Sequence, residues 1–462
     1  MTLPHSPVQP QGRTQKLYFA AWRWHFYTGL FVIPFLATLA LTGLAMLWIA
    51  WVDGRDGERT PVTAQAHALP LSAQADAAQA ILPDGILKTY VAPRGADLAA
   101  LFRIDHDGDA VMVAVDPYTA TVIETFPRRS GWYDFADSLH SDLMLGVTGD
   151  RILETAASLT MLLIATGLYM WWPRNLGWRH ALLPSRGRGR TTWRSLHGVV
   201  GFWISLFLAL FLVSGLAWAG LWGGKMVQAW SQFPAEKWDN VPLSGDTHAS
   251  MDHTRREVPW ALEQTPMPAS GGTAGISGVI GATVDIDSVD ALARQIGFGG
   301  RYQLSIARGD TGVWTLSRDS MSTDSINPTS DRTVHVDRYT GKILADVRFA
   351  DYSWPGKAMA VGIALHMGTL GLWSVLANTL VCLSILFLCA SAVVLWWKRR
   401  PTKSGRLSAP PMPKELPLWK GAGLVGIAVC IAFPMAGLAL LALLMLDGLI
   451  LTRLPALRHR LT

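Results

Sequence analysis

The sequence predicts a membrane protein built as an α-helical bundle, with four core helices from an internal duplication, a further C-terminal helix and two exported α+β modules. Half of the 462 residues are hydrophobic and only 16% are charged, which is too apolar for an ordinary soluble protein. Matching motifs in the two halves indicate the duplication. Five apolar runs are each long enough to cross a hydrocarbon core of roughly 30 Å: 26–52, 152–172, 198–222, 373–397 and 421–446.

Two histidine motifs occur once in each half of the chain. The first joins a histidine at the mouth of a span to Gly-Leu-Ala eighteen residues later, at His25 with Gly43–Ala45 and again at His197 with Gly215–Ala217. The second places Leu-His before a span that ends in Trp-Trp and a basic residue, at His140 with Trp171–Arg174 and again at His366 with Trp396–Arg399. The four histidines therefore form two matched pairs.

Arginine and lysine are concentrated in the short loops, and basic residues of short loops are retained on the cytoplasmic side of a membrane. Residues 174–194 contain six arginines and no acidic residue, and residues 398–406 contain five basic residues. These loops and the N-terminus are therefore predicted to be cytoplasmic, with the long insertions on the opposite face. The net charge of +6 is a topology signal and gives no support to nucleic-acid binding.

The first apolar run is too long for a cleavable signal peptide and is expected to remain as a signal anchor. For the last run, one crossing is favoured over a kink at Pro434 that lets the chain re-enter. The predicted segments are an N-terminus (1–23), span 1 (24–52), exported module 1 (53–139), a histidine segment with span 2 (140–172), an Arg-rich loop (173–197), span 3 (198–222), exported module 2 (223–355), a histidine segment with span 4 (356–397), a loop (398–420), span 5 (421–446) and a tail (447–462).

Each exported insertion is expected to hold one α+β module. A helical stretch at 72–82 precedes strands near 100–104 and 111–115, and a helical stretch at 288–296 precedes strands near 303–306 and 313–316. Both modules close on Asp-x-Tyr-Thr, which begins at Asp116 and at Asp337. Aspartate in such a motif caps backbone amides in a hairpin turn, and this interpretation is favoured over a catalytic one.

These motifs resemble those of the PepSY-associated transmembrane proteins, including inner-membrane ferric-siderophore reductases of the FoxB type. The resemblance covers roughly residues 15–400 and is most specific at 139–174 and 365–399. It implies four core helices that carry two b-type haems, and exported PepSY-like modules that could receive a chelated metal. Residues 421–462 lie outside the resemblance.

Paired histidines on facing helices suit haem, because two axial imidazoles leave the iron six-coordinate and fit for electron transfer. His25 and His197 are expected to hold the inner haem, and His140 and His366 the outer haem, since halves of the same topology place each pair at one depth. Pairing of His25 with His140 is excluded only because these two histidines are expected at different depths in the membrane. The chain has no C-x-x-C-H motif, so both haems would be held without covalent attachment.

Arg23 and Arg194 lie just before the inner histidines, where a guanidinium could bind a haem propionate. The alternative for both arginines is topological anchoring, and the alternative for a single boundary histidine is a contact with lipid headgroups.

The predicted function is electron transfer across the bacterial inner membrane to a ferric-siderophore, or another ferric chelate, on the periplasmic side. Such a ferric-chelate reductase releases iron because hard oxygen ligands hold Fe(III) more tightly than Fe(II). No nucleotide-binding motif is present, so a cytoplasmic reductase or membrane quinol is the expected electron donor. The alternative is a haem-free, membrane-anchored PepSY sensor or protease-regulating binding protein. A transporter built on parallel repeats is disfavoured, because the first four spans contain few breaks or charges.

Overall fold

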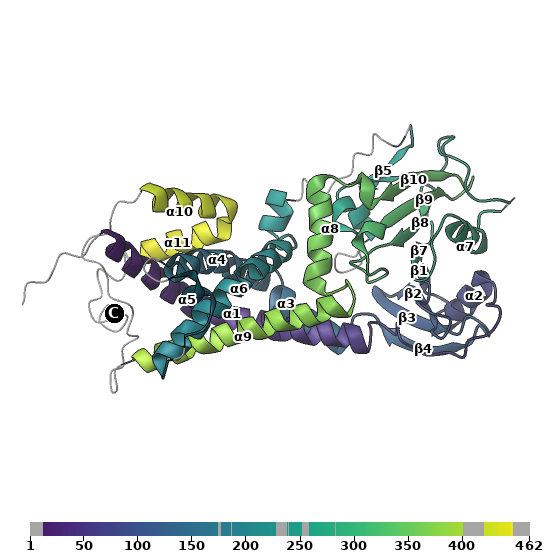
Figure 1. Ribbon diagram of the computed structural model, residues 1–462. Helices are drawn as coiled ribbons and strands as arrows, with labels where there is room; N and C mark the ends of the chain where they lie inside the picture. The colour runs from purple at the N-terminus through teal and green to yellow at the C-terminus, as the bar shows by residue number, and fades with distance from the viewer. Residues whose placement is uncertain are drawn as a thin grey trace, which may run out of the picture. The chain divides into compact units, whose positions relative to one another are not determined.

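The computed structural model describes residues 13–173, 177–185, 187–227, 238, 240–251, 258–281, 283–400 and 420–446. The predicted tail (447–462), and parts of the predicted cytoplasmic segments, lie outside the described residues. The chain forms two compact units (Figure 1). The helical unit comprises residues 1–41, 139–222 and 380–462, and the sheet unit comprises residues 42–138 and 223–379.

Within the described ranges, four helices are long and apolar enough to cross a membrane, as the sequence predicts. They are α1 (Arg13–Val52), α4 (Val147–Trp171), α6 (Arg190–Leu216) and α9 (Leu372–Arg399). The histidine segments before the second and fourth spans are helices of their own, α3 (Trp132–Asp142) and α8 (Trp354–Met367). Gly146 and Gly368, both with positive φ, lie at the breaks before α4 and after α8.

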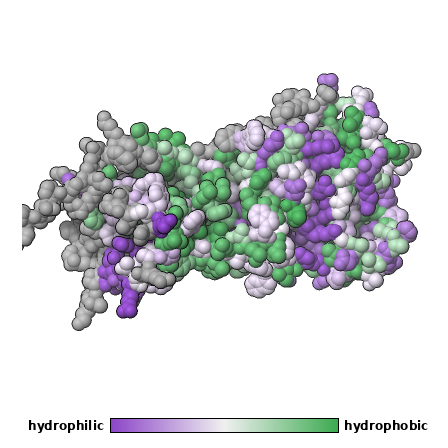
Figure 2. Space-filling view, in the orientation of Figure 1, coloured by the Kyte–Doolittle hydropathy of each residue, from purple (hydrophilic) through white to green (hydrophobic). Residues whose placement is uncertain are grey.

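The helical unit is held together by close packing of α4 on α6. The Trp171 ring stacks on the Phe202 ring with centroids 3.9 Å apart. Glu154 of α4 is buried, and its carboxylate accepts hydrogen bonds from the backbone N–H groups of Leu221 (3.1 Å) and Trp222 (2.8 Å). Leu206 remains 66% exposed, and Figure 2 shows hydrophobic side chains covering these helices. An apolar exterior of this kind is suited to a lipid bilayer.

The last apolar segment, predicted to cross the membrane once as the fifth span, is instead divided into two helices. They are α10 (Lys420–Ala432) and α11 (Pro434–Leu446), each of 13 residues. Neither helix is long enough to cross the hydrocarbon core. The break falls at Pro434, whose ring prevents a continuous helix. The two helices pack on each other, and a Cβ added at Gly437 would lie 3.1 Å from Cys430 Cβ. The structure therefore corresponds to the kinked alternative.

The two predicted exported modules form one continuous antiparallel sheet of eight strands. The first module contributes a helix, α2 (Leu71–Ile81), and the second contributes a matching helix, α7 (Ile286–Gln295). The modules join where Tyr90 pairs with Leu304, between β1 and β7. The strand order is β4 (Val122–Pro127), β3 (Asp109–Val115), β2 (Ala100–His106), β1 (Ile86–Val91), β7 (Gln303–Ser305), β8 (Val313–Arg318), β9 (Arg332–Asp337) and β10 (Ile343–Arg348).

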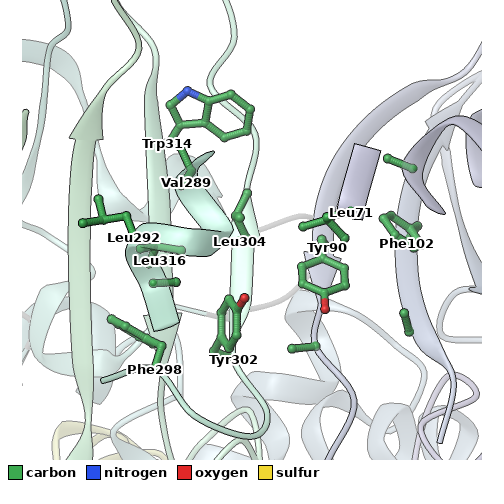
Figure 3. Close-up of a cluster of buried hydrophobic side chains, with 14 of the residues drawn as sticks. Leu71, Tyr90, Phe102, Val289, Leu292, Phe298, Tyr302, Leu304, Trp314 and Leu316 are labelled. Atoms are coloured by element: carbon green, nitrogen blue, oxygen red, sulfur yellow. The ribbon is translucent and has the colours of Figure 1, made fainter. Parts of the chain in front are cut away.

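One hydrophobic core spans both modules under α2 and α7. Side chains alternate between the faces of a strand, so Tyr90, Phe102 and Leu304 share the face that the helices cover. Figure 3 shows Tyr90 and Tyr302 on the two sides of the join, and their ring centroids are 6.1 Å apart. The buried residues that pack with α2 and α7 come from strands of both modules. β5 (Leu243–Thr247) and β6 (Pro266–Pro268) form a separate two-stranded sheet.

The repeated Asp-x-Tyr-Thr motif forms the turns of the β3–β4 and β9–β10 hairpins. Asp116 accepts a hydrogen bond from the N–H of Tyr118 at 2.8 Å. Asp337 accepts from the N–H groups of Tyr339 and Thr340, and also of Gly271, each at 2.8 Å. The capping interpretation of both aspartates is confirmed.

We expect Asp337→Ala to lower the free energy of unfolding of the sheet unit by about 2–3 kcal/mol, because three backbone N–H groups lose their acceptor. Asp116→Ala is the matched control and should cost about 1 kcal/mol, since one N–H is affected. Thermal unfolding followed by near-ultraviolet circular dichroism measures both. Equal losses in the two variants would contradict this account of the turn.

Buried carboxylates lie close together in the segment between β8 and β9. Arg301 forms ion pairs with Asp324 of this segment (2.9 Å) and with Glu58 of the first module (2.7 Å), so the charge of Asp324 is compensated. Burial and the neighbouring Asp319 carboxylate raise the pKa of Asp331 to about 8. The folded sheet unit therefore binds a proton at Asp331 that the unfolded chain releases near pH 4. Stability from this group is present at low pH and is lost as the pH rises from about 4 to 8.

Asp331→Asn should therefore raise the melting temperature more at pH 8 than at pH 5, by a difference on the order of 1 kcal/mol or more, because the amide does not ionise across the window in which the carboxyl group loses stability. The amide oxygen can still accept from the N–H of Ser320, which donates to Asp331 at 2.9 Å. Calorimetry at both pH values tests this, with Asp109→Asn on the exposed start of β3 as the control. A variant that is destabilised equally at both pH values would contradict the expectation.

Candidate haem-ligand site in the helical unit

The helical unit brings together His25 of α1 and His197 of α6, which the sequence predicts as a pair. Their ring centroids are 6.4 Å apart and the ring planes are nearly perpendicular, at 88°. Two imidazoles on opposite sides of one metal ion, with metal–nitrogen bonds of about 2 Å, have centroids roughly 6 Å apart. The spacing therefore fits axial ligation of one iron.

Each of these imidazoles is held by a hydroxyl group on a neighbouring helix. Nδ1 of His25 lies 3.0 Å from Oγ1 of Thr166 on α4, and Nδ1 of His197 lies 2.8 Å from Oγ of Ser391 on α9. Both hydroxyls donate their own proton to a backbone carbonyl of the preceding turn. Each hydroxyl oxygen therefore accepts from Nδ1–H, which leaves the lone pair of the neutral imidazole on Nε2.

This arrangement is what metal-ligating histidines require, since their second ring nitrogen almost always donates to a neighbouring oxygen. The two hydroxyl residues were missed by the sequence analysis, although a signal existed. Thr166 and Ser391 each lie five residues before the Trp-Trp pair, at Trp171 and Trp396, so they occupy equivalent positions of the repeat.

Gly167 provides the space that the His25 ring occupies beside α4. A Cβ added at Gly167 would lie 3.3 Å from Cε1 of His25, which is tighter than an ordinary contact. A side chain at this position would displace the imidazole, so the glycine is a packing requirement of the site.

Arg399, at the end of α9, is a further residue of the site that no sequence pattern indicated. Its guanidinium lies over the rings of Trp22 (5.2 Å) and Phe26 (4.8 Å), in the turns of α1 that flank His25. Within the described part of the chain, Nε and Nη2 of Arg399 are buried and have no hydrogen-bond partner. Buried guanidinium nitrogens without a hydrogen-bond partner are suited to an anion such as a carboxylate.

The two arginines proposed from the sequence have other surroundings. The Arg23 guanidinium lies 5.0 Å from the centroid of the Tyr27 ring, and Arg194 is exposed on α6. Both positions agree with the anchoring alternative. The geometry therefore favours Arg399 as the residue for a haem propionate.

The outer histidines lie in different units, and their pairing remains a prediction. His140 of α3 forms a hydrogen bond with the backbone of Leu39, in the helical unit. His366 lies in the last turn of α8, in the sheet unit, where its carbonyl accepts from Nδ2 of Asn378 at 3.0 Å.

In the part of the chain that the structure describes, no three His, Cys, Asp or Glu side chains converge as ligands for a metal ion. Haem makes no such demand, because the porphyrin supplies four nitrogens and the protein supplies only the axial ligands. The inner histidine pair with its oriented nitrogens fits this group.

The fold and the site define a helical membrane protein with an internal repeat and an antiparallel sheet assembled from both halves. The chain belongs to the family of the PepSY-associated TM region, whose model matches residues 22–399. That range contains all four predicted ligand histidines. A comparison with curated proteins finds none that matches the chain.

Proposed function

We propose that this protein is a di-haem b electron-transfer protein of the bacterial inner membrane, which reduces a ferric-siderophore or another ferric chelate on the periplasmic side. The observation that carries the proposal is the His25–His197 pair, with both Nδ1 atoms anchored and a spacing suited to one iron. Family membership supports the membrane architecture, and the electron-transfer role rests on the site.

At the inner site, His25 and His197 would bind iron through Nε2 while Thr166 and Ser391 hold the opposite nitrogens. Arg399 would neutralise a propionate, which lowers the cost of burying that charge. When bound, haem supplies a one-electron carrier. His140 and His366 would hold the outer haem, and cytoplasmic loops rich in arginine and lysine would face the electron donor, a reductase or the quinol pool.

One electron suffices for the proposed reaction at the periplasmic side. The ferric ion of the chelate gains that electron and becomes ferrous, and its oxygen ligands then hold it less tightly. No covalent bond has to be made by the protein, so redox carriers and a place for the chelate to approach are sufficient. A haem-free anchored PepSY sensor is the alternative, and it requires no electron carrier.

His25→Ala and His197→Ala should each remove about half of the bound haem, because only one of the two imidazoles that would hold the inner haem remains. His140→Ala and His366→Ala should each remove the other half. Pyridine haemochrome analysis of the detergent-purified protein measures the content, with exposed His67→Ala as the control. Unchanged haem content in all four variants would refute the ligand assignment, and a wild type without haem would favour the sensor.

Arg399→Leu should weaken haem binding by about tenfold or more, since a buried charged hydrogen bond is lost. It should also lower the midpoint potential of the inner haem, because removing a positive charge favours the ferric state. Potentiometric titration and haem retention on dialysis measure the two effects. Arg400→Leu is the matched control, because the Arg400 guanidinium lies over the Trp396 and Trp397 rings. Equal behaviour of the two variants would contradict a propionate contact at Arg399.

A further inference from the structure

We propose that His248 and His335 form a second metal site, in the sheet unit, which takes a divalent transition-metal ion that accepts imidazole ligands. His335 lies on β9, and His248 lies on the 3-10 helix His248–Met251, which covers the polar face of the sheet. Both side chains are fully buried, and their Nε2 atoms are 2.9 Å apart. The proposal concerns the sheet unit alone and does not depend on the haem assignment.

The two rings are oriented toward each other by their remaining nitrogens. Nδ1 of His248 lies 2.7 Å from the carbonyl oxygen of Thr265, which can only accept, so this nitrogen carries the proton. Nδ1 of His335 lies 3.0 Å from the hydroxyl of Thr315, its partner across the strand pair. Carbonyl and hydroxyl oxygens at Nδ1 are the usual supports of histidines that bind metal through Nε2.

The spacing of the two Nε2 atoms is close to that of two ligands on one ion. Nitrogens that are each about 2.1 Å from a metal, at angles between a right angle and the tetrahedral angle, lie roughly 3.0–3.4 Å apart. The observed 2.9 Å requires opening by only a few tenths of an ångström. Burial lowers the pKa of His248 to about 4, so the ring is neutral near pH 7, as a ligand must be.

The pair can exchange a hydrogen bond for a metal ion without net release of a proton. In the metal-free protein, His335 donates from Nε2 to the Nε2 lone pair of His248, and the Thr315 hydroxyl donates to Nδ1 of His335. With the ion bound, the His335 proton lies on Nδ1 and the Thr315 oxygen accepts it. The ion then takes the two Nε2 lone pairs, and each ring stays neutral.

A polar cavity beside His248 offers room for the remaining ligands. Its volume is about 40 Å³, enough for one or a few water molecules. The sheet lines it with side chains that can hydrogen-bond to metal-bound water: Thr89, Gln303, Ser305, Thr315, Ser317 and Thr333. Two protein nitrogens and water make a site that exchanges its ion readily. Imidazole ligands suit zinc, copper, iron and nickel.

Equilibrium dialysis of the full-length, tag-free protein against Zn²⁺, followed by metal analysis, tests the site. We expect the wild type to retain one Zn²⁺ per chain, and His335→Gln and His248→Gln each to weaken binding by at least about tenfold. His106→Gln, on the same sheet but outside the cavity lining, is the matched control. Zn²⁺ should also raise the melting temperature of the wild type and of His106→Gln, because it binds the folded state, and should leave that of His335→Gln and His248→Gln nearly unchanged.

A wild type that retains no Zn²⁺, or histidine variants that retain as much as the wild type, would overturn the proposal. The pair would then be only a hydrogen-bonded clasp between β9 and the covering segment. Glutamine at either position keeps a hydrogen-bonding side chain, and the two single variants remove one ligand from different elements. Haem content measured on the same samples distinguishes failure of this site from failure of the proposed electron-transfer function.

Discussion

Hydrocarbon offers no hydrogen-bond partner, so polar groups carried into the helical unit are stabilised by pairing inside the protein. His25 and His197 meet this constraint through Thr166 and Ser391, and Glu154 meets it through the backbone of the turn after α6. Each pairing also ties one helix to another, so satisfying the polar groups sets which helices are neighbours. Because these contacts hold Nδ1 of each ring, the lone pair of each neutral imidazole lies on Nε2.

The duplication explains why the inner site is symmetric in its chemistry. In each half a histidine of one span is held by a hydroxyl residue of the next span, α1 by α4 and α6 by α9. The two half-sites are alike, and one iron between them would receive the same ligand from both. In the sheet unit the duplication has another result, because each half supplies four strands and one helix to a shared core. There, equivalent positions have diverged, and His335 with its partner His248 is found in the second half alone.

Sequence patterns identified the four spans, the two helices of the sheet unit and the capping role of Asp116 and Asp337, because each depends on local hydrophobicity or turn chemistry. They did not reveal β1, which alternates weakly, or the division of the last apolar segment at Pro434, where one crossing and a kink were both compatible with the pattern. They also selected Arg23 and Arg194 by nearness in the chain, whereas Arg399 reaches the turns around His25 from a different helix.

The sequence by itself determined that this is a membrane protein with a repeated pair of histidines, since apolar length and recurring motifs are properties of the chain alone. Only the tertiary structure decided which polar groups complete each site. Thr166, Ser391 and Arg399 are far from His25 and His197 in the sequence, and the packing of helices brings them together. The union of two modules into one sheet was likewise decided by tertiary pairing, because the β1–β7 contact joins strands about two hundred residues apart and buries a core that neither half contains alone.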